Sequence, residues 1–338
     1  MNLTLADCGD VVCWGVHILD VLGRPVEVIP PGQHSVLIDE IRLTAAGTAA
    51  GTSVDLAKLG VRVRNVGALG DDYIGDVVAD LLSSQGVDVT HVIRRRGERT
   101  SATILPIRPN GERPALHAAG ASATATFGDF SPETWTMVES ARVVHLGGLD
   151  AMPALDSEGV AAVVARARER GAVVTMDVLR NEGPEGLERM APILRYVNWF
   201  CPNDEQLRTL TGRDDLEEAA HVVRQRGVDG VVVTRGAQGC LVVEAERTTG
   251  FPALAVDVVD TTGCGDAFDA GFVAGLVAGL EPLEAAWLAT ACGALVATGL
   301  GSDAGIVDLA QVVARLASWD DCPDAVGVAG ALREFVNQ

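Results

Sequence analysis

Hydrophobic residues follow two alternating patterns along most of the chain. Short runs rich in Val, Ile and Leu predict strands at residues 11–14, 61–66, 143–146, 172–176, 196–200 and 230–234. Helical spacing of apolar residues predicts helices over 51–59, 74–85, 160–170 and 216–226. Gly60 and Gly86 follow the first two of these helices, as is typical of helix C-termini. This order predicts an α/β fold, a mostly parallel sheet with helices on both faces.

Two segments interrupt this alternation of predicted strands and helices. Residues 24–42 contain Pro25, Pro30 and Pro31 among alternating apolar positions, and residues 99–117 alternate around a turn at 109–111. We expect both segments to form short strands that leave the main sheet as a small antiparallel lid. The predicted organisation is therefore a core of residues 1–23, 43–98 and 118–338, with a lid of residues 24–42 and 99–117.

The charge balance excludes several classes of function. The chain has 338 residues, with 26 Lys and Arg against 46 Asp and Glu, and a formal net charge of −20. Such a charge opposes general attraction to nucleic acid or to anionic membranes, so we expect neither as a partner. The only lysine is Lys58, which Leu59 follows, so the chain has no G-x-x-x-x-G-K-[ST] phosphate loop. We expect Lys58 to lie solvated on a helix face.

The remaining composition favours a cytoplasmic location. Seven cysteines form no C-x-x-C pair, and most lie among apolar residues, as is typical of reduced, buried thiols. The N-terminus lacks a basic segment, and no apolar run reaches membrane-spanning length. The six histidines show no zinc-ligand spacing.

The candidate anion-binding and catalytic residues lie in one segment, residues 256–268. Gly263 and Gly265 flank a small residue and precede a long apolar run, which predicts a strand, a tight turn and a helix N-terminus. Backbone N–H groups of residues 263–266 would point at one spot, where the helix dipole favours an anion. Asp266 lies at the helix start. Spacing alone leaves two roles open for it, a helix cap or a general base.

This run resembles the D-T-x-G-A-G-D signature of the ribokinase-like (PfkB) carbohydrate kinase family, with Cys264 in place of the usual Ala. The resemblance implies a ribokinase-like three-layer α/β/α sandwich with a small β lid. It implies that Asp266 is the catalytic base and that Gly263, Cys264 and Gly265 form an anion hole. It also places Asp260 near a site for a monovalent cation such as K⁺.

Five further motifs resemble those of the family in the same order, and the resemblance covers roughly residues 8 to 315. These motifs lie at residues 15–20, 46–54 and 67–75, then at 201–206 and 234–239 as P-N-x-x-E-like and T-x-G-x-x-G runs. The implied substrate contacts are Asp20, Gly47, Thr48, Gly51 and Arg180. The implied nucleotide contacts are Asn203, Thr234, Gly236 and Gly239. Asn203 and Glu205 are implied to hold Mg²⁺, Glu205 through water.

Structural alternatives remain open for several of these residues. Asp20 also fits a turn cap before Gly23, Gly47 and Gly51 also fit close helix packing, and Thr234 also fits an ordinary turn.

Some positions depart from the family pattern. Gln206 stands where a Glu is usual and removes a charge that would help to hold Mg²⁺. Gly51 replaces an Asn that usually contacts the sugar, and Ala46 replaces a Gly. Residues 146–148 lack the Glu of ribokinases proper, so ribose is not the first acceptor we expect.

The leading hypothesis is an ATP-dependent kinase that phosphorylates a hydroxyl of a sugar, a sugar acid or a related small molecule. The alternatives are a nucleoside kinase and a non-catalytic sugar-binding member of the fold. An exposed lid edge favours a homodimer formed through the lid.

Overall fold

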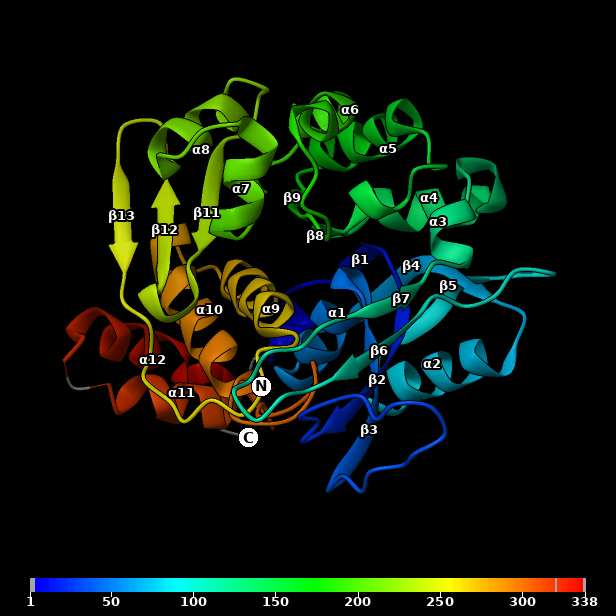
Figure 1. The fold of residues 1–338 in the computed structure, drawn as a ribbon. Helices are drawn as coiled ribbons and strands as arrows, with labels where there is room; N and C mark the ends of the chain where they lie inside the picture. The colour runs from blue at the N-terminus through cyan, green and yellow to red at the C-terminus, as the bar shows by residue number, and fades with distance from the viewer. Residues whose placement is uncertain (1–3, 320, 337–338) are drawn as a thin grey trace.

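The computed structural model describes residues 4–319 and 321–336, which form two β-sheets and three layers (Figure 1). The large sheet has the strand order β13-β12-β11-β10-β9-β8-β1-β4-β5. Its strands are β1 (Val11–Gly15), β4 (Val63–Gly70), β5 (Asp88–Arg95), β8 (Val143–Gly147), β9 (Val173–Asp177), β10 (Trp199–Phe200), β11 (Gly230–Thr234), β12 (Cys240–Val243) and β13 (Thr248–Phe251). The pairings from β11 to β5 are parallel, whereas β12 and β13 add to one edge as an antiparallel hairpin.

Both faces of the large sheet are buried, as the continuous apolar strands predict. Along β1, Val11 and Cys13 belong to one hydrophobic cluster, while Val12 and Trp14 belong to another on the opposite face. Side chains alternate between faces along a strand, so a single strand supplies both cores. The chain thus forms the three-layer α/β/α sandwich that the sequence predicts.

Helices cover both faces, and one of the two layers joins helices that are distant in sequence (Figure 1). One layer contains α1 (Thr48–Lys58), α2 (Tyr73–Ser84), α9 (Cys264–Val277), α10 (Pro282–Val296), α11 (Leu309–Ala317) and α12 (Pro323–Val336). The other contains α3 (Ala121–Thr124), α4 (Pro132–Glu139), α5 (Ser157–Glu169), α6 (Pro184–Leu194), α7 (Asp204–Thr211) and α8 (Leu216–Arg224). Short 3₁₀ turns lie at η1 (Leu5–Cys8), η2 (Phe127–Asp129), η3 (Leu149–Ala151) and η4 (Gly236–Gln238).

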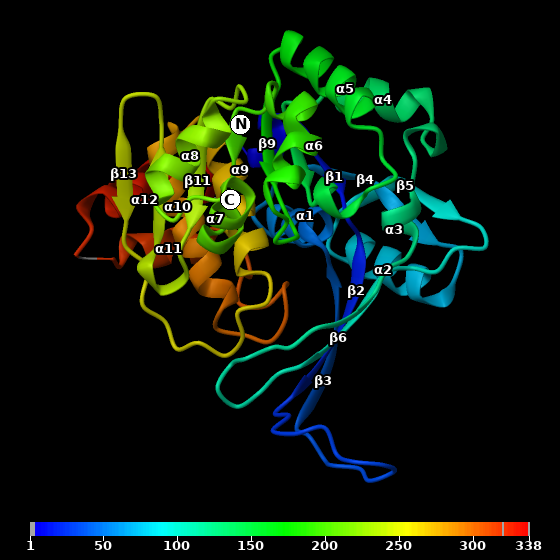
Figure 2. The same ribbon diagram turned by 45° about the horizontal axis from the view of Figure 1, so that its top comes forward.

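A four-stranded sheet, the lid, projects from the core (Figure 2). Its order is β3-β2-β6-β7, with β2 (Ile18–Arg24), β3 (Glu40–Ala46), β6 (Ala102–Pro106) and β7 (Leu116–Ala118). The sequence predicted an antiparallel lid, but the sheet is mixed. Strands β2 and β6 run parallel, whereas the other two pairs are antiparallel. The chain passes through α1, β4, α2 and β5 of the core between β2 and β6, and such a crossover permits parallel pairing.

The predicted boundary of the first lid segment was wrong in position. Strand β2 lies almost wholly within the segment 1–23 that we assigned to the core, and most of β3 lies beyond residue 42. Residues 25–39 form an irregular connection instead. Pro25, Pro30 and Pro31 lack the N–H that a strand donates, so these residues cannot extend the ladder.

Other predicted elements lie close to their observed positions, with informative differences. Helix α1 begins at Thr48, three residues before the predicted start, because Gly47 takes the cap position with φ 90°. The sequence did not reveal α6, α10 or the β12–β13 hairpin. Among the described residues, none of the helices combines the length and apolar character that crossing a membrane requires.

Candidate active site

The main cavity lies between the lid and the carboxyl ends of the parallel strands. Its volume is about 630 Å³, within the usual range for a small-molecule site. Asp177 at the end of β9 and Thr234 at the end of β11 face it from the core, and Asp20 of β2 faces it from the lid. Parallel strands place their carboxyl ends at one edge of the sheet, which brings residues from many segments together there.

Helix α9 begins at this edge and supplies the nest of N–H groups. Gly263 caps the helix with φ 78°, and a Cβ at this position would lie 2.4 Å from the Cα of Ser302. Gly263 and Gly265 line the cavity, while the Cys264 N–H bonds to the Thr261 carbonyl at 3.4 Å. The Cys264 N–H is therefore partly engaged. The first-turn N–H groups of Gly265 and Asp266 have no partner within the helix and lie at its positive end.

Asp266 occupies the third position of α9 and lines the cavity. Burial raises the pKa of its carboxyl to about 7, the negative charge of Asp20 adds to the rise, and the Arg113 guanidinium opposes it. A carboxylate with a pKa near neutrality can accept a proton at physiological pH. Asp266 therefore presents to the cavity a carboxyl that can exchange a proton near neutral pH.

Asp260 lies behind the nest, not in the cavity lining, and holds two loops together. Its Oδ1 accepts hydrogen bonds from the Thr262 N–H (3.0 Å) and hydroxyl (2.9 Å), and its Oδ2 accepts one from the Gly301 N–H (3.0 Å). The carboxylate, only 1% exposed, therefore fixes residues 261–263 against residues 299–305.

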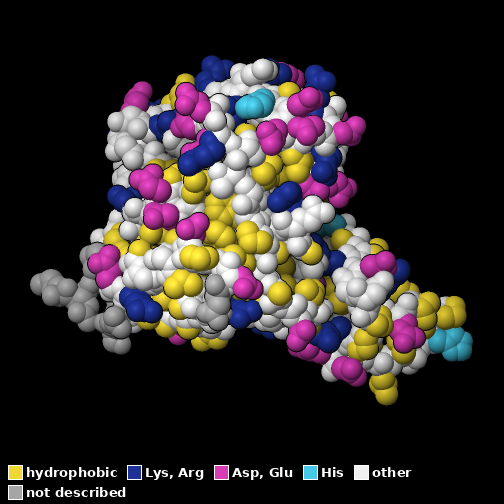
Figure 3. Space-filling model, turned by 90° about the vertical axis from the view of Figure 1, so that its left-hand side faces the viewer, with side chains coloured by type: hydrophobic (Ala, Val, Ile, Leu, Met, Phe, Trp, Pro, Cys, Tyr) yellow, Lys and Arg dark blue, Asp and Glu magenta, His cyan; other side chains and the backbone are white. Residues whose placement is uncertain are grey.

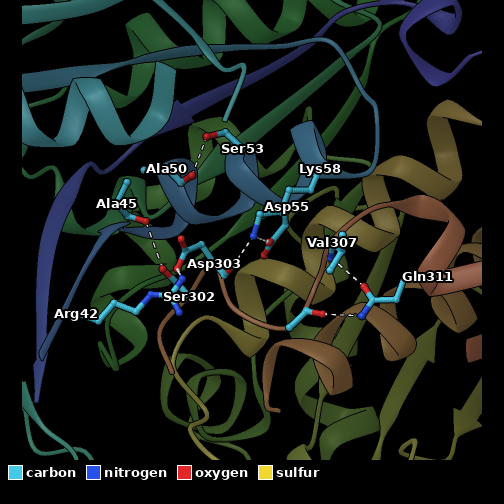
Figure 4. Close-up of polar contacts among 11 residues, drawn as sticks. Arg42, Ala45, Ala50, Ser53, Asp55, Lys58, Ser302, Asp303, Val307 and Gln311 are labelled. Carbon is cyan, nitrogen blue, oxygen red and sulfur yellow. Dashed lines mark hydrogen bonds and ion pairs between the residues drawn. The ribbon is translucent and has the colours of Figure 1, made fainter. Parts of the chain in front are cut away.

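The loop 299–305 is anchored from three directions (Figure 4). The Ser302 hydroxyl donates to the Ala45 carbonyl (3.3 Å), and Arg42 Nη2 lies 3.0 Å from Asp303 Oδ1. Lys58 of α1 donates to the Asp303 carbonyl and lies 3.9 Å from Asp55 Oδ1. The back wall of the nest is thus tied to the lid strand β3 and to α1.

Lys58 is therefore not the solvated lysine that we expected. Its side chain is only 13% exposed, and that of Asp55 is fully buried. Helical periodicity placed Lys58 at the end of α1 without showing that a loop 245 residues later covers it.

The predicted substrate residues lie at different depths. Gly47 and Thr48 line the cavity, and Thr48 Oγ1 has no hydrogen-bond partner among the described residues. Gly51 lies outside the lining, and a Cβ on it would lie 2.5 Å from Asp266 Oδ2. Gly51 therefore faces the carboxylate of Asp266 rather than the cavity.

Asp20 forms the lid side of the cavity and is 7% exposed. Burial raises the pKa of its carboxyl to about 6, while a hydrogen bond with Thr103 and the charge of Arg113 oppose the rise. The negative charge of Asp20 raises the pKa of Asp266, so the two carboxyls lie close to each other.

Arg180 lines the cavity opposite the lid, on a loop that a buried carboxylate orients. Asp150 accepts hydrogen bonds from the N–H groups of Leu179 (2.9 Å) and Arg180 (2.7 Å). The Arg180 side chain lies 3.5 Å from Glu182 and is close enough to His117 to lower the pKa of that imidazole, after burial as the main cause.

The structure brings Asn203 and Thr234 side by side. The two residues form an isolated parallel bridge, and both line the cavity together with Gly236. Gly239 does not line it, because it packs against Phe251 of β13.

Asn203 also begins α7 through a reciprocal cap, and this explains Gln206. Asn203 Oδ1 accepts from the Gln206 N–H, and Gln206 Oε1 accepts from the Asn203 N–H, both at 2.8 Å. The Gln206 amide also donates to the Val178 carbonyl at 2.7 Å. Gln206 therefore joins α7 to the end of β9, and its oxygen is already engaged.

The protein offers few ligands for a metal ion. Glu205 is exposed outside the cavity lining and accepts a hydrogen bond from Asn181 at 3.0 Å. Within residues 4–319 and 321–336, no group of three His, Cys, Asp or Glu side chains has an arrangement suited to a metal. The residues present fit a Mg²⁺ ion that takes most of its ligands from nucleotide phosphates and water, as this ion commonly does.

The cavity residues that the sequence did not predict include Arg113, Ser302 and Asp177. Arg113 enters from the β6–β7 hairpin, Ser302 from the loop after α10, and Asp177 from the end of β9. Asp177 had only an indirect signal, its position three residues before Arg180. Arg113 and Ser302 had none, because their approach to the nest depends on the tertiary fold.

Known proteins share the sequence pattern and the fold of this chain. Residues 9–308 match the pfkB family carbohydrate kinase. Aminoimidazole riboside kinase of Salmonella typhimurium is 32% identical over 302 residues, which cover 82% of this chain and 88% of that protein. Ribokinase of Arabidopsis thaliana, solved with ribose and ATP, has a TM-score of 0.77 at 22% identity over 91% of this chain and 98% of its own.

A third similarity is to a fructokinase of Vibrio cholerae, solved with fructose, ADP and a calcium ion. Its TM-score is 0.73 at 23% identity, covering 91% of this chain and 98% of the other. The structural similarities show a shared fold, and the family match spans nearly the whole chain. The chain belongs to the pfkB family of carbohydrate kinases.

Proposed function

We propose that this kinase transfers the γ-phosphoryl group of ATP to a hydroxyl of a sugar, a sugar acid or a related small molecule. The observation that carries the proposal is Asp266, a carboxyl of near-neutral pKa in the first turn of α9 beside the nest glycines Gly263 and Gly265. Asp266 removes the proton of the acceptor hydroxyl, and the nest stabilises the charge on the transferring phosphoryl group.

ATP is proposed to lie at the carboxyl ends of β10 and β11. Asn203, Thr234 and Gly236 line that part of the cavity and support a nucleotide position. Gly239 contributes by shaping the turn that carries Gly236, since it packs against β13. The triphosphate then extends toward the nest at the start of α9.

Mg²⁺ is proposed to bind mainly through the phosphates, with Asn203 nearby and Glu205 acting through water. When bound, it neutralises phosphate charge. The fructokinase structure with ADP and calcium supports the pairing of a nucleotide with a divalent ion in a protein of this fold. K⁺ near Asp260 rests on the motif alone, because all three hydrogen bonds of that carboxylate are internal.

The acceptor is proposed to lie between the lid and α1. Asp20 and the unpartnered Thr48 hydroxyl can bind sugar hydroxyls. Gly47 leaves room beside them, and Arg180 lies at the far end of the cavity. The similarity to aminoimidazole riboside kinase supports the nucleoside alternative, in which a ribosyl hydroxyl is the acceptor and the base lies along the lid. The non-catalytic alternative is disfavoured, because the base and the nest glycines are present together.

A homodimer through the lid is also proposed. The outer face of the lid carries Ile41, Leu43, Ile104 and Leu116, which are 43–69% exposed. Val21 lies opposite both Leu43 and Ile104, and Ile104 lies opposite Leu116, so these side chains form one apolar stripe. Figure 3 shows hydrophobic side chains gathered on the protruding part of the molecule. A second lid would cover such a surface.

We also propose a reducing, cytoplasmic location, because the cysteine thiols are free. Cys13, Cys201, Cys240 and Cys292 are free and buried, and Cys264 is free within the nest.

The test is an ADP-release assay with Mg²⁺ over sugars, sugar acids and nucleosides, with and without K⁺. Turnover with one class identifies the acceptor. Absence of turnover with every class, from protein that still binds ATP, would favour the non-catalytic alternative.

A further inference from the structure

The hairpin between β6 and β7 carries Arg113 to the edge of the nest. Arg113 Nε donates a hydrogen bond to Thr261 Oγ1 at 3.3 Å, although the two residues are 148 positions apart. Figures 1 and 2 show this hairpin reaching from the lid toward the segment that precedes α9. Arg113 also lines the cavity. A lid residue is thus placed beside the loop that precedes the phosphate nest.

The guanidinium acts on the acidic groups around the proposed transfer point. Its positive charge lowers the pKa values of Asp20, Cys264 and Asp266, against the larger effect of burial. Asp20 belongs to the lid, whereas Cys264 and Asp266 belong to the start of α9. Arg113 is therefore close to both sides of the cavity, where the acceptor hydroxyl and the phosphoryl group would meet.

Arg113 also has no carboxylate partner within the described residues, in contrast to neighbouring arginines. Arg108 on the same hairpin lies 2.8 Å from Glu112, and Arg180 lies 3.5 Å from Glu182. In a protein of net charge −20, an exposed arginine without an ion pair, beside a nest of N–H groups, is free to bind an anion.

We propose that Arg113 is a catalytic residue that binds the non-bridging oxygens of the transferring phosphoryl group. The inference rests on the proposed function. In the reaction, Asp266 accepts the proton of the acceptor hydroxyl, and the freed oxygen pair forms the new O–P bond. The bond between the γ-phosphorus and the β–γ bridging oxygen breaks, and its electron pair stays on ADP. Arg113 donates hydrogen bonds throughout and exchanges no proton.

The first test does not require the acceptor to be known. ADP with Mg²⁺ and aluminium fluoride mimics the transferring phosphoryl group, and such analogues bind more tightly than ground states. Calorimetric titration would compare wild type, Arg113→Ala, Arg113→Lys and the control Arg108→Ala. We expect Arg113→Ala to weaken aluminium fluoride binding to the ADP complex by about 10²-fold, with ADP affinity changed by less than about threefold. Arg113→Lys should recover part of the loss, because it keeps the charge without the planar fork.

The second test uses the acceptor that the ADP-release panel identifies. Arg113→Ala should lower kcat by about 10²- to 10³-fold with little change in the KM for ATP, and added guanidinium ion should restore part of the rate. The inference is overturned if Arg113→Ala matches Arg108→Ala in aluminium fluoride affinity, or if it raises only the KM of the acceptor. Failure of the proposed function is distinguishable, because it appears as absence of turnover in the wild type, while the fluoride titration still tests Arg113.

Discussion

Gly51 faces Asp266 so closely that a β-carbon on Gly51 would lie 2.5 Å from Asp266 Oδ2 and 2.9 Å from its Cγ. The second turn of α1 therefore packs against the proposed catalytic base without a side chain between them. Position 51, where the family usually has Asn, here leaves room for the carboxylate.

Gly51→Ala should therefore damage catalysis more than folding. The new methyl group must displace the Asp266 carboxylate, and a misplacement of about 1 Å can cost about 10²-fold in rate. We expect kcat to fall by about that factor, while the melting temperature stays near that of wild type because Ala favours the helix. Gly330→Ala is the matched control, since it is also a helical glycine and nothing lies within 4 Å of its added Cβ. Equal kcat in both variants would contradict the packing relationship.

Asp266→Asn should remove the general base while leaving the nest intact. We expect kcat to fall by roughly 10²- to 10⁴-fold, with a modest change in ATP affinity measured by calorimetry. Asp257→Asn is the control, because Asp257 is an exposed acid in the same segment outside the cavity. Near-wild-type turnover of Asp266→Asn would rule out the proposed base.

The activity should depend on pH through Asp266. Its pKa is raised to about 7, and only the ionised form accepts a proton, so kcat/KM should rise with pH and level off above about pH 8. Because the charge of Asp20 contributes to the rise, Asp20→Asn should move the acidic limb to lower pH. The measurement is kcat/KM between about pH 5.5 and about pH 9. A flat profile across neutrality would exclude Asp266 as the titrating base.

Lys58→Met should destabilise the fold. Asp55 is fully buried, neither of its carboxylate oxygens has a hydrogen bond among the described residues, and Lys58 is the cation beside it. We expect a loss of about 1–3 kcal/mol in the free energy of unfolding, measured by urea denaturation, because the buried Asp55 carboxyl loses the neighbouring positive charge.

The pH dependence of this loss tests the ion pair. Burial raises the pKa of Asp55 well above its ordinary value, and Lys58 opposes that rise. In the folded state the Asp55 carboxyl therefore keeps its proton to higher pH than in the unfolded chain. Its ionisation as pH rises lowers the free energy of unfolding, and this loss is larger without Lys58. The Lys58→Met penalty should thus be larger at about pH 8 than at about pH 5, whereas a constant penalty would contradict the pair. Arg333→Met, on α12, is a surface control.

The lid stripe should control the oligomeric state. Leu43→Asp combined with Ile104→Asp places two charges on the stripe, and we expect the double variant to be a monomer by light scattering at concentrations where wild type is a dimer. Val258→Asp changes an exposed apolar residue outside the lid and should leave the mass unchanged. A wild-type protein that is monomeric throughout would contradict the proposal.

Elements with local signals could be predicted from the amino-acid sequence. Strand periodicity, the glycines around Cys264 and the position of Asp266 at a helix start are set by residues within a few positions of each other, so the α/β sandwich and the nest were predictable. The edge hairpin β12–β13 and helices α6 and α10 lacked such clear local signals.

The residues around the nest, in contrast, come together only when the chain folds. Arg113 meets Thr261 across 148 residues, Lys58 meets Asp303 across 245, and Ser302 meets Ala45 across 257. The near-neutral pKa of Asp266 likewise arises from burial and from Asp20 on another segment. Desolvation and charge depend on which segments pack together, and no pattern of neighbouring residues along the chain contains that information.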